Sequence, residues 1–556
     1  MRRIVVLLLF ASVQVFGQRP SEEEAVLRVL GVLQMEEADA EDVERLTDLL
    51  RHPVKINAAG RRDLEATGLF TPFQIASLLD YRERHGDVMS FIELSSVDGF
   101  TTQAAGRLEP FLTFDSGSLA RKARQQFKGE INARTAVKLT EGDGHEWKYA
   151  LKGKLIFRDA FGVSFSPFSH SASLSWTYGP GSIILGDFNA RFGQGLCLWN
   201  TSVIGGLTSP SSYMRRASGI STSYSFSAAN AMTGVAGNLS LGKWCMSSLL
   251  HFPGLKKADF SALNPAVNFS RYFSFGHVGF TASGGFSDLD IRNFMIPQLR
   301  VSGDASFCFK GVNVFGEAMY DMVGMAPAAV VGVESPAGEY TTVASLVRYL
   351  PLSDQHCWAA SMESKKKRHS FLASVEAIYH PSGKTLSEGS AVQLKGQSEW
   401  HWDLCRWLSS EVRLTERFRT WGTPYRTDAR IDLMADVGLL KIASRFNMLM
   451  CRGVGLLGYV EAQYKDNAGL KAYLRQGIFR IDNWDDRIYV YERDAPGNFN
   501  VPAYYGRGIW TSGYLSWRFA QWGSIYARGS YVAYPMMGEK KKPGKAELKL
   551  QCVLHL

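Results

Sequence analysis

The chain is 556 residues long, longer than one ordinary domain, with 12% aromatic and 21% charged residues and a formal net charge of +9. Its 53 glycines favour a β-rich chain with many turns. No internal run of about 18 apolar residues occurs, which excludes a protein that spans a membrane on helices. The seven cysteines are widely spread among apolar residues, so their spacing fits neither a zinc site nor a disulfide framework.

The first 17 residues have the layout of a signal peptide. Arg2 and Arg3 precede an apolar core at residues 4–10, and Gly17 lies just before the expected cleavage site at Gln18. No cysteine follows the cut, so anchoring as a lipoprotein is not indicated. We therefore expect an exported protein.

Charge divides the mature chain into an acidic head and a basic body. The head, residues 18–115, holds 19 acidic and 10 basic residues and has a net charge of −9, whereas residues 116–556 carry +16. In the head, apolar residues recur with helical spacing over 21–35 and 40–50, and a proline follows the second run. We predict an acidic helical segment over residues 18–53.

Residues 54–114 predict more short helices, joined by tight turns at Gly68 and Gly99. Together with the pairs Ile56-Asn57 and Tyr81-Arg82, these turns resemble the tandem helix-hairpin-helix domain of competence-type DNA receptors. The resemblance implies that backbone N–H groups at the helix start after each hairpin hold a phosphate. The residues of the two hairpins and their phosphate sites would be Gly68, Leu69, Thr71, Gly99, Phe100 and Thr102.

Both hairpins depart from that family's pattern of glycine, hydrophobic residue, glycine. Phe70 and Thr101 stand where the second glycine is expected, and the first turn of each following helix has no lysine or arginine. Phosphate binding scales with the number of cations presented, so a head with a net charge of −9 disfavours nucleic acid as a partner. We expect a fold that is kept for packing or protein contact.

The body begins after a polar, basic stretch at residues 115–126, which we predict to be a linker. Side chains then alternate between two faces over residues 127–139 and 147–158, and Trp147 and Tyr149 open the apolar face of the second run. This period-two pattern predicts barrel strands with their polar faces turned inward. The inward cations form a candidate basic lumen: Lys128, Arg134, Lys138, Lys148, Lys152, Lys154 and Arg158.

The final strand, residues 546–556, has one apolar and one mostly polar face. An edge strand of a soluble β-protein could show this pattern, but closed barrels and helices alone satisfy backbone groups in lipid. We predict a mainly β fold: a large antiparallel transmembrane β-barrel over residues 127–556, preceded by a small all-α helix-hairpin-helix domain. At about 22 to 27 residues for each strand with its loop, the barrel would have roughly 16 to 20 strands.

Several motifs of the body combine charged, aromatic and glycine residues: LGDF (185–188), RFGQGL (191–196), VFGE (314–317), RIYVYE (487–492) and VPAYYG (501–506). They resemble a family of large exported barrel proteins from Bacteroidota that carry helix-hairpin-helix heads. The resemblance implies a location in the cell outer membrane, with the N-terminal domain in the periplasm. Charged residues in and beside these motifs form a candidate polar network, which we interpret as lumenal or loop salt bridges: Asp187, Arg191, Asp485, Arg487 and Glu492.

No catalytic, cofactor-binding or metal-binding motif stands out, so we expect neither an enzyme nor a cofactor. Three functions remain. The first is an outer-membrane channel or transport protein for an anionic or bulky solute, with the head as a periplasmic plug or docking domain. The second is a DNA-binding receptor for DNA uptake. The third is a non-conducting scaffold whose head recruits a periplasmic protein partner.

The expected surroundings of the body are outer-membrane lipid and lipopolysaccharide. The opposite charges of head and body motivate one further hypothesis. Attraction between them would guide the head to the periplasmic mouth of the barrel, or inside it, where the head would gate a basic channel.

Overall fold

The structure, a computed structural model, describes most of the chain beyond its N-terminus. The described residues are 22–116, 127–142, 144–158, 160–200, 207–226, 230–257, 259, 261–287, 295–366, 368–384, 389–466, 468–535 and 542–556. The expected signal peptide and most of the expected linker lie outside these ranges. Within the described ranges, no helix is long and apolar enough to cross a membrane.

The head is built from short helices. They are α2 (Glu22–Leu30), η1 (Met35–Glu37), α3 (Ala40–Arg51), α4 (Arg61–Thr67), α5 (Pro72–His85), α6 (Phe91–Leu94), α7 (Thr102–Leu108) and η2 (Glu109–Phe111). Helix α3 begins where the Asp39 carboxylate accepts hydrogen bonds from two backbone N–H groups, and α5 begins with a capping box between Thr71 and Gln74. Strands β1 (Val54–Lys55) and β2 (Leu112–Thr113) pair in parallel and join the two ends of the region that holds α4 to η2.

The longer strands form one closed antiparallel barrel, in which β29 pairs with β3 to complete the circle. The strands of the first half are β3 (Phe127–Thr140), β4 (Gly144–Phe157), β5 (Phe161–Ser166), β6 (Ser171–Tyr178), β7 (Gly181–Arg191), β8 (Gly219–Thr222), β9 (Met232–Leu241), β10 (Trp244–His251), β11 (Asn264–Phe273), β12 (Gly276–Ser287), β13 (Met295–Phe309), β14 (Val312–Asp321), β15 (Ala326–Pro336) and β16 (Thr341–Leu350). Those of the second half are β17 (Gln355–Lys365), β18 (His369–His380), β19 (Ala391–Cys405), β20 (Leu408–Arg419), β21 (Tyr425–Val437), β22 (Leu440–Met450), β23 (Val454–Lys465), β24 (Leu470–Ile481), β27 (Gly506–Ala520), β28 (Gly523–Ala533) and β29 (Lys545–His555). The short strands β25 (Ile488–Tyr489) and β26 (Ala503–Tyr504) pair separately from the wall.

Among the described residues the wall has 24 strands, because β7 pairs directly with β9, and β8 pairs there with β7 alone. The predicted count of roughly 16 to 20 strands is therefore too low. It assumed long connections, whereas many neighbouring strands are joined by two residues, such as those between β13 and β14 and between β21 and β22. Tight hairpins leave more of the chain for the wall.

The outside of the barrel is apolar, as the alternation of the final strand shows. On β29, Leu548 and Leu550 are 58% and 50% exposed, whereas Gln551 and Val553 are buried on the inner side. Tryptophan and tyrosine side chains, among them Trp147, are exposed on the same outer surface. A closed barrel with this outer surface satisfies its backbone in lipid. The predicted fold class, a large antiparallel barrel after a small helical head, is confirmed.

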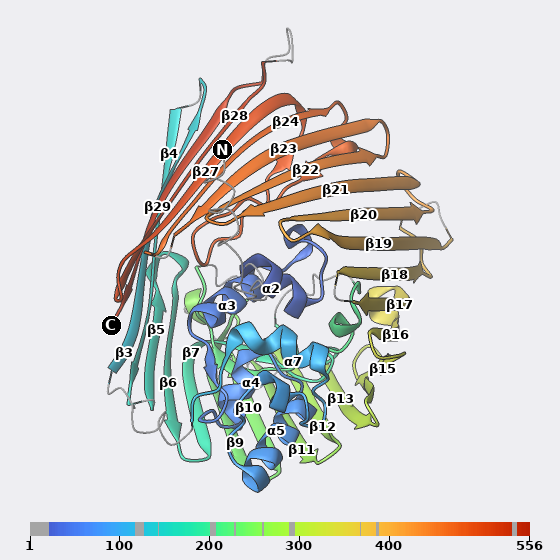
Figure 1. Cartoon of the computed structure of the whole chain (residues 1–556). Helices are drawn as coiled ribbons and strands as arrows, with labels where there is room; N and C mark the ends of the chain where they lie inside the picture. The colour runs from blue at the N-terminus through green and yellow to red at the C-terminus, as the bar shows by residue number, and fades with distance from the viewer. Residues whose placement is uncertain are drawn as a thin grey trace, which may run out of the picture.

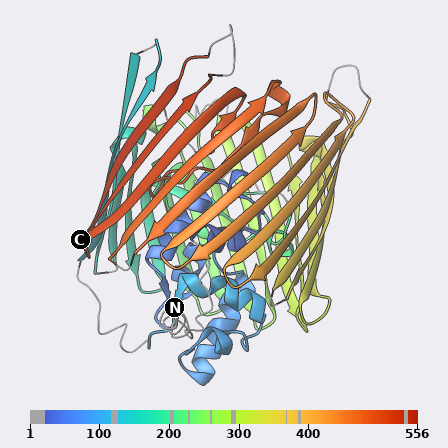
Figure 2. The same cartoon turned by 45° about the horizontal axis from the view of Figure 1, so that its top comes forward.

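The head lies inside the barrel. In Figure 1 the blue helices α2 to α7 are surrounded by the wall that runs from β3 round to β29. Figure 2 shows that the light-blue helices reach past one rim, while the dark-blue ones lie deeper in the lumen. Helix α5 contacts β11, β12 and β13.

Two segments between wall strands fold inward and meet the head. The first inner loop, residues 207–218, donates a hydrogen bond from the Ser209 backbone N–H to the Gly31 carbonyl oxygen over 3.1 Å. The second inner loop, residues 484–505, packs Tyr491 and Phe499 against the apolar core of the head. The head is therefore held by loops as well as by wall side chains.

Candidate functional site

The candidate site is the interface between the acidic head and the lumen of the barrel. Carboxylates from α2, η1 and α3 form ion pairs with cations of wall strands and of the second inner loop. The described pairs are Glu22–Lys471, Glu23–Arg493, Glu36–Arg445, Glu37–Lys395, Glu41–Arg191, Asp42–Arg191 and Glu44–Lys152. The acidic segment thus neutralises cations spread around the lumen.

Arg191, at the end of β7, joins the wall to the start of α3. Its Nη2 lies 3.3 Å from Glu41 Oε1 and its Nη1 lies 3.1 Å from Asp42 Oδ1, and the side chain is only 6% exposed. Burial alone would raise the pKa of Asp42. The guanidinium groups of Arg45 and Arg191 outweigh burial and hold that pKa below its ordinary value, so Asp42 stays ionised beside them.

Glu36, in η1, is held from two sides. Its Oε1 lies 3.3 Å from Arg445 Nη1 and accepts a hydrogen bond from the Tyr491 backbone N–H over 2.7 Å. Burial acts to raise the pKa of Glu36, but Arg445 and Arg430 together lower it below the ordinary value. Arg445 also donates to Asp432 Oδ1 over 2.7 Å, so Glu36 completes a network that the wall has begun.

Arg413, on β20, binds the turn between α2 and η1. Its Nη2 donates to the Leu33 carbonyl oxygen over 2.5 Å and its Nη1 donates to Gln34 Oε1 over 2.8 Å. The same guanidinium lies 2.6 Å from Glu399 Oε2, on β19. A backbone carbonyl of the head is thereby satisfied by a buried wall cation.

Of the predicted basic lumen, Lys152 lies in the interface with the head, and Arg134 is held by other segments of the barrel. Lys152 is buried, pairs with Glu44, and places its ammonium 4.1 Å from the centre of the Tyr224 ring. Arg134 lies over Phe226 and donates to Asn498 of the second inner loop. Lys152 is therefore covered by the head and Tyr224, and Arg134 by Phe226 and the second inner loop.

The other five predicted cations are distributed along β3 and β4. Lys138 pairs with Glu547 of β29 at 3.8 Å, and Lys148 pairs with Glu146 at 3.2 Å where both side chains are more than half exposed. Lys154 lies 5.8 Å from the centre of the Tyr224 ring. Lys128 is exposed near the start of β3, and Arg158 follows β4 in a turn with a φ of 51°.

The residues of the predicted polar network have separate partners. Buried Asp187 lies 3.0 Å from Lys256 Nζ, whereas Arg191 binds the head. Glu492, also buried, accepts from Arg528 over 2.5 Å. Asp485 pairs with Arg452 at 2.8 Å, and Arg487 stacks on Trp484 and donates to Tyr489; both of these contacts lie among exposed side chains. Arg191 and Glu492 thus belong to the lumen, and Asp485 and Arg487 to the exposed part of the second inner loop.

The RFGQGL motif forms a tight turn around Glu317 of β14. The Glu317 carboxylate accepts from the backbone N–H groups of Gln194, Leu196 and Cys197 over 2.7, 3.0 and 3.2 Å. Gly193 has a φ of 59°, and a Cβ there would lie 2.8 Å from Glu317 Oε2. The glycine is required by both conformation and space, and the turn aims Arg191 at the head.

The predicted hairpin residues lie at two turns of the head. Gly68 and Gly99 have φ values of 61° and 84°, Leu69 and Phe100 are buried, Thr71 caps α5, and Thr102 is the first residue of α7. The Phe70 and Phe100 rings pack edge to face at 6.1 Å. A Cβ at Gly68 would lie 2.6 Å from Arg45 Nη1, so the first hairpin is already covered by α3.

A narrow cavity of about 50 Å³ separates these turns from the wall. Thr71, Gly99 and Thr101 line it on the head side, and Arg216 and Glu334 line it on the barrel side. The helix starts that would receive a phosphate therefore face the inside of the barrel.

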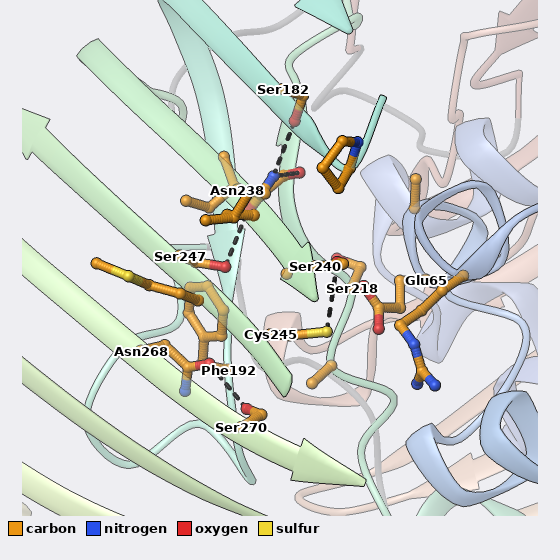
Figure 3. Close-up of a pocket in the computed structure, with 18 of the residues that line it drawn as sticks. Glu65, Ser182, Phe192, Ser218, Asn238, Ser240, Cys245, Ser247, Asn268 and Ser270 are labelled. Atoms are coloured by element: carbon orange, nitrogen blue, oxygen red, sulfur yellow. Dashed lines mark hydrogen bonds between the residues drawn. The ribbon is translucent and has the colours of Figure 1, made fainter. Parts of the chain in front are cut away.

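A larger cavity of about 390 Å³ lies between α4 and the wall from β6 to β13. Figure 3 shows Asn238, Ser247 and Asn268 on the wall, with Glu65 on the head side. Ser247 donates to Asn238 Oδ1 over 2.7 Å, and Glu65 accepts from the Tyr272 hydroxyl over 3.1 Å. Hydroxyl and amide groups give this space a polar lining.

Most of the barrel cations that bind the head were not among the site residues predicted from the sequence. They lie on strands β19 to β24 and in the second inner loop: Lys395, Arg413, Arg430, Arg445, Lys471 and Arg493. Charged residues at alternate positions, such as Arg430 and Asp432, mark an inward polar face. That pattern identifies a lumen-facing row, but it does not identify the partner across the lumen.

No family model and no curated protein matches the sequence. Among solved structures, the copper transporter OprC matches with 8% identity and a TM-score of 0.43, covering 78% of this chain and 80% of that one. The FrpB iron transporter from Neisseria meningitidis matches with 9% identity and a TM-score of 0.35, covering 80% and 84%. OccK5 from Pseudomonas aeruginosa matches with 7% identity and a TM-score of 0.31, covering 78% and 98%. Similarity this low gives no basis for assigning the cargo of those proteins to this chain.

Proposed function

We propose that the protein is an outer-membrane transport barrel whose acidic head closes the lumen from the periplasmic side. A 24-stranded barrel encloses more space than wall side chains alone fill. The observation that carries the proposal is the set of ion pairs between α2, η1 and α3 and the lumenal cations. In this proposal, the helix-hairpin-helix fold serves as a plug.

The charge of the interface favours an anionic solute. Arg191, Lys395 and Lys471 are neutralised by carboxylates of the head. When the head moves away, these cations are left in a lumen whose chain carries an excess of positive charge. A solute with several carboxylates or phosphates would compete with the head for the same cations, and this competition would couple solute arrival to opening.

The experiment is single-channel recording in planar bilayers with the full chain and with a variant that lacks residues 18–115. We expect the full chain to be closed for most of the recording and the shortened variant to conduct continuously. Heat-dependent gel mobility and far-UV circular dichroism check that the shortened barrel is folded. Equal conductance of the two folded proteins would contradict a closing role for the head.

A second function, recruitment of a periplasmic protein, is favoured by one surface of the head. Met89 and Ile92, before and within α6, are 65% and 66% exposed. Two exposed large apolar side chains this close together suit a protein contact. Met89→Ser with Ile92→Ser would abolish capture of such a partner and leave the bilayer conductance unchanged, so the two functions are distinguishable.

The geometry counts against DNA uptake by this head in its docked position. Arg45 covers the first hairpin, and Arg216 and Glu334 face the helix starts across a space of about 50 Å³. A duplex needs an open face with several cations. DNA binding would therefore require the head to leave the lumen.

A further inference from the structure

Three metal-ligating side chains meet where the head touches the closing seam of the barrel. They are His52 at the end of α3, Glu130 on β3 and His555 on β29. His52 Nε2 lies 3.6 Å from Glu130 Oε2, and His555 Nδ1 lies 3.8 Å from the same oxygen. One potential ligand atom from each residue lies within 4.8 Å of the other two.

The fold brings these residues together from three distant parts of the chain. The register of the seam places His555 directly opposite Glu130, and the C-cap of α3 carries His52. The side chains of His52 and His555 are 52% and 28% exposed, so solvent and ions reach them. The centres of the two imidazole rings are 5.2 Å apart, and the ring planes are inclined at 69°.

The groups around Glu130 orient its carboxylate so that it can bind a metal ion. The Tyr224 hydroxyl donates to Glu130 Oε1 over 3.1 Å, which orients the carboxylate and leaves Oε2 directed at the two histidines. Such outer hydrogen bonds fix the ligands of metal sites. Of the nearby cations, Lys152 is paired with Glu44 and Arg51 lies over the Tyr526 ring.

We propose that His52, Glu130 and His555 bind a divalent transition metal of the Zn²⁺ class. Two imidazole nitrogens and one carboxylate oxygen are ligands that Zn²⁺ accepts, with a fourth position left to water. Bonds of about 2.0 to 2.2 Å place tetrahedral ligand atoms roughly 3.3 to 3.5 Å apart. The two contacts to Glu130 are already close to this separation, and the half-exposed His52 side chain has room to turn inward.

The bound metal would tie the head to both ends of the barrel wall at once. His52 belongs to the head, whereas Glu130 and His555 belong to the first and last wall strands. A ligand that binds the docked state and not the released state shifts the equilibrium toward docking. The site would therefore act as a metal-dependent latch.

The test is isothermal titration of Zn²⁺ into the metal-free full chain in detergent. We expect one Zn²⁺ per chain, and binding at least tenfold weaker in His52→Ala, Glu130→Gln and His555→Ala. His369→Ala, which removes an exposed imidazole of β18, is the matched control and should bind as the wild type does. The proposal is overturned if the wild type binds no Zn²⁺, or if the three variants bind it as tightly as the control.

A second measurement does not depend on removing a ligand. Tyr224→Phe keeps all three ligands and removes only the hydrogen bond to Glu130, so we expect Zn²⁺ affinity to fall about tenfold.

Co²⁺ added to the wild type should give the intense visible absorption of a four-coordinate site, and His52→Ala should lack it. The same weak spectrum in both proteins would overturn the proposal.

Discussion

Arg413 illustrates how single wall residues fix the head. Its side chain is 5% exposed and is shared between Glu399 of the wall and the Leu33 carbonyl oxygen of the head. A buried guanidinium is stable only when its donors are satisfied. The docked head supplies part of that satisfaction, so removal of Arg413 damages the wall network and the docking together.

We expect Arg413→Ala to weaken docking of the head by about 3 kcal/mol, because Glu399 is left buried without its cation. Hydrogen exchange of the backbone amides in α2 and α3, followed in the full chain, measures this change. The matched control is Arg480→Ala, whose side chain is 67% exposed and lies 3.8 Å from Asp482. Its effect should stay below about 1 kcal/mol. Equal exchange in both variants would show that Arg413 does not hold the head.

The sequence pattern predicted which way a side chain faces better than it predicted which residue it pairs with. Lys152 was expected to face the lumen from the alternation of its strand, and it is buried there. Its partner Glu44 lies 108 residues earlier in the chain, and no local pattern could connect them. Asp187 and Arg191 are close in sequence, yet they bind Lys256 and the head respectively, because their side chains meet different parts of the lumen.

The segment from α2 to α3 is the element that carries the docking charge. Its carboxylates respond to pH in opposite directions. The pKa of Glu36 and that of Asp42 lie below their ordinary values, whereas burial raises the pKa of Asp39 and that of Glu41. A lowered pKa means that docking stability is complete above the ordinary pKa and is lost as the pH falls below it. The raised pKa values of Asp39 and Glu41 mean that protonation of these two carboxyls favours docking as the pH falls.

The pKa of His52, at the end of α3, is raised by its contact with Glu130. Its contribution is therefore present at low pH and is lost as the pH rises through that pKa. With metal removed by a chelator, we predict slightly firmer closure at about pH 6 than at pH 8, and opening below about pH 4 as Glu36 and Asp42 take up protons. Single-channel recording across this range measures the open fraction.

Glu36→Gln is the control for this pH prediction. The amide mimics the protonated carboxyl, so the variant should already open at pH 7, and acid should add less to its open fraction than it adds to the wild type. An open fraction that stays constant from pH 7 to below pH 4, in both proteins, would contradict the prediction.

The strands were predictable because their period of two is local, and the run expected at residues 127–139 corresponds to β3, at Phe127–Thr140. The number of strands was not predictable, because the lengths of the connections between strands had to be assumed. The inner loops were missed for a different reason. In the sequence alone, the motifs that contain Ile488, Val490 and Tyr504 resemble further wall strands. In the structure these residues are buried inside the lumen.

The whole molecule combines a wide barrel with an occupant of opposite charge. The cations that line the lumen repel one another when the lumen is empty, and the acidic head relieves that repulsion. The interface is therefore strong when the head is docked and poised for competition by anions. Closure and selectivity would then have the same physical origin.

A reversible staple between head and wall tests this closure most directly. Gln103 of α7 and Thr342 of β16 touch through Oε1 and Oγ1 at 3.4 Å, so Gln103→Cys with Thr342→Cys places two thiols across the interface. The wild type under the same oxidant controls for its seven native cysteines. We predict that the oxidised double variant stays closed in single-channel recordings and that reduction restores openings like those of the wild type. Equal currents before and after reduction, with the disulfide verified by mass spectrometry, would contradict a head that must move for the barrel to conduct.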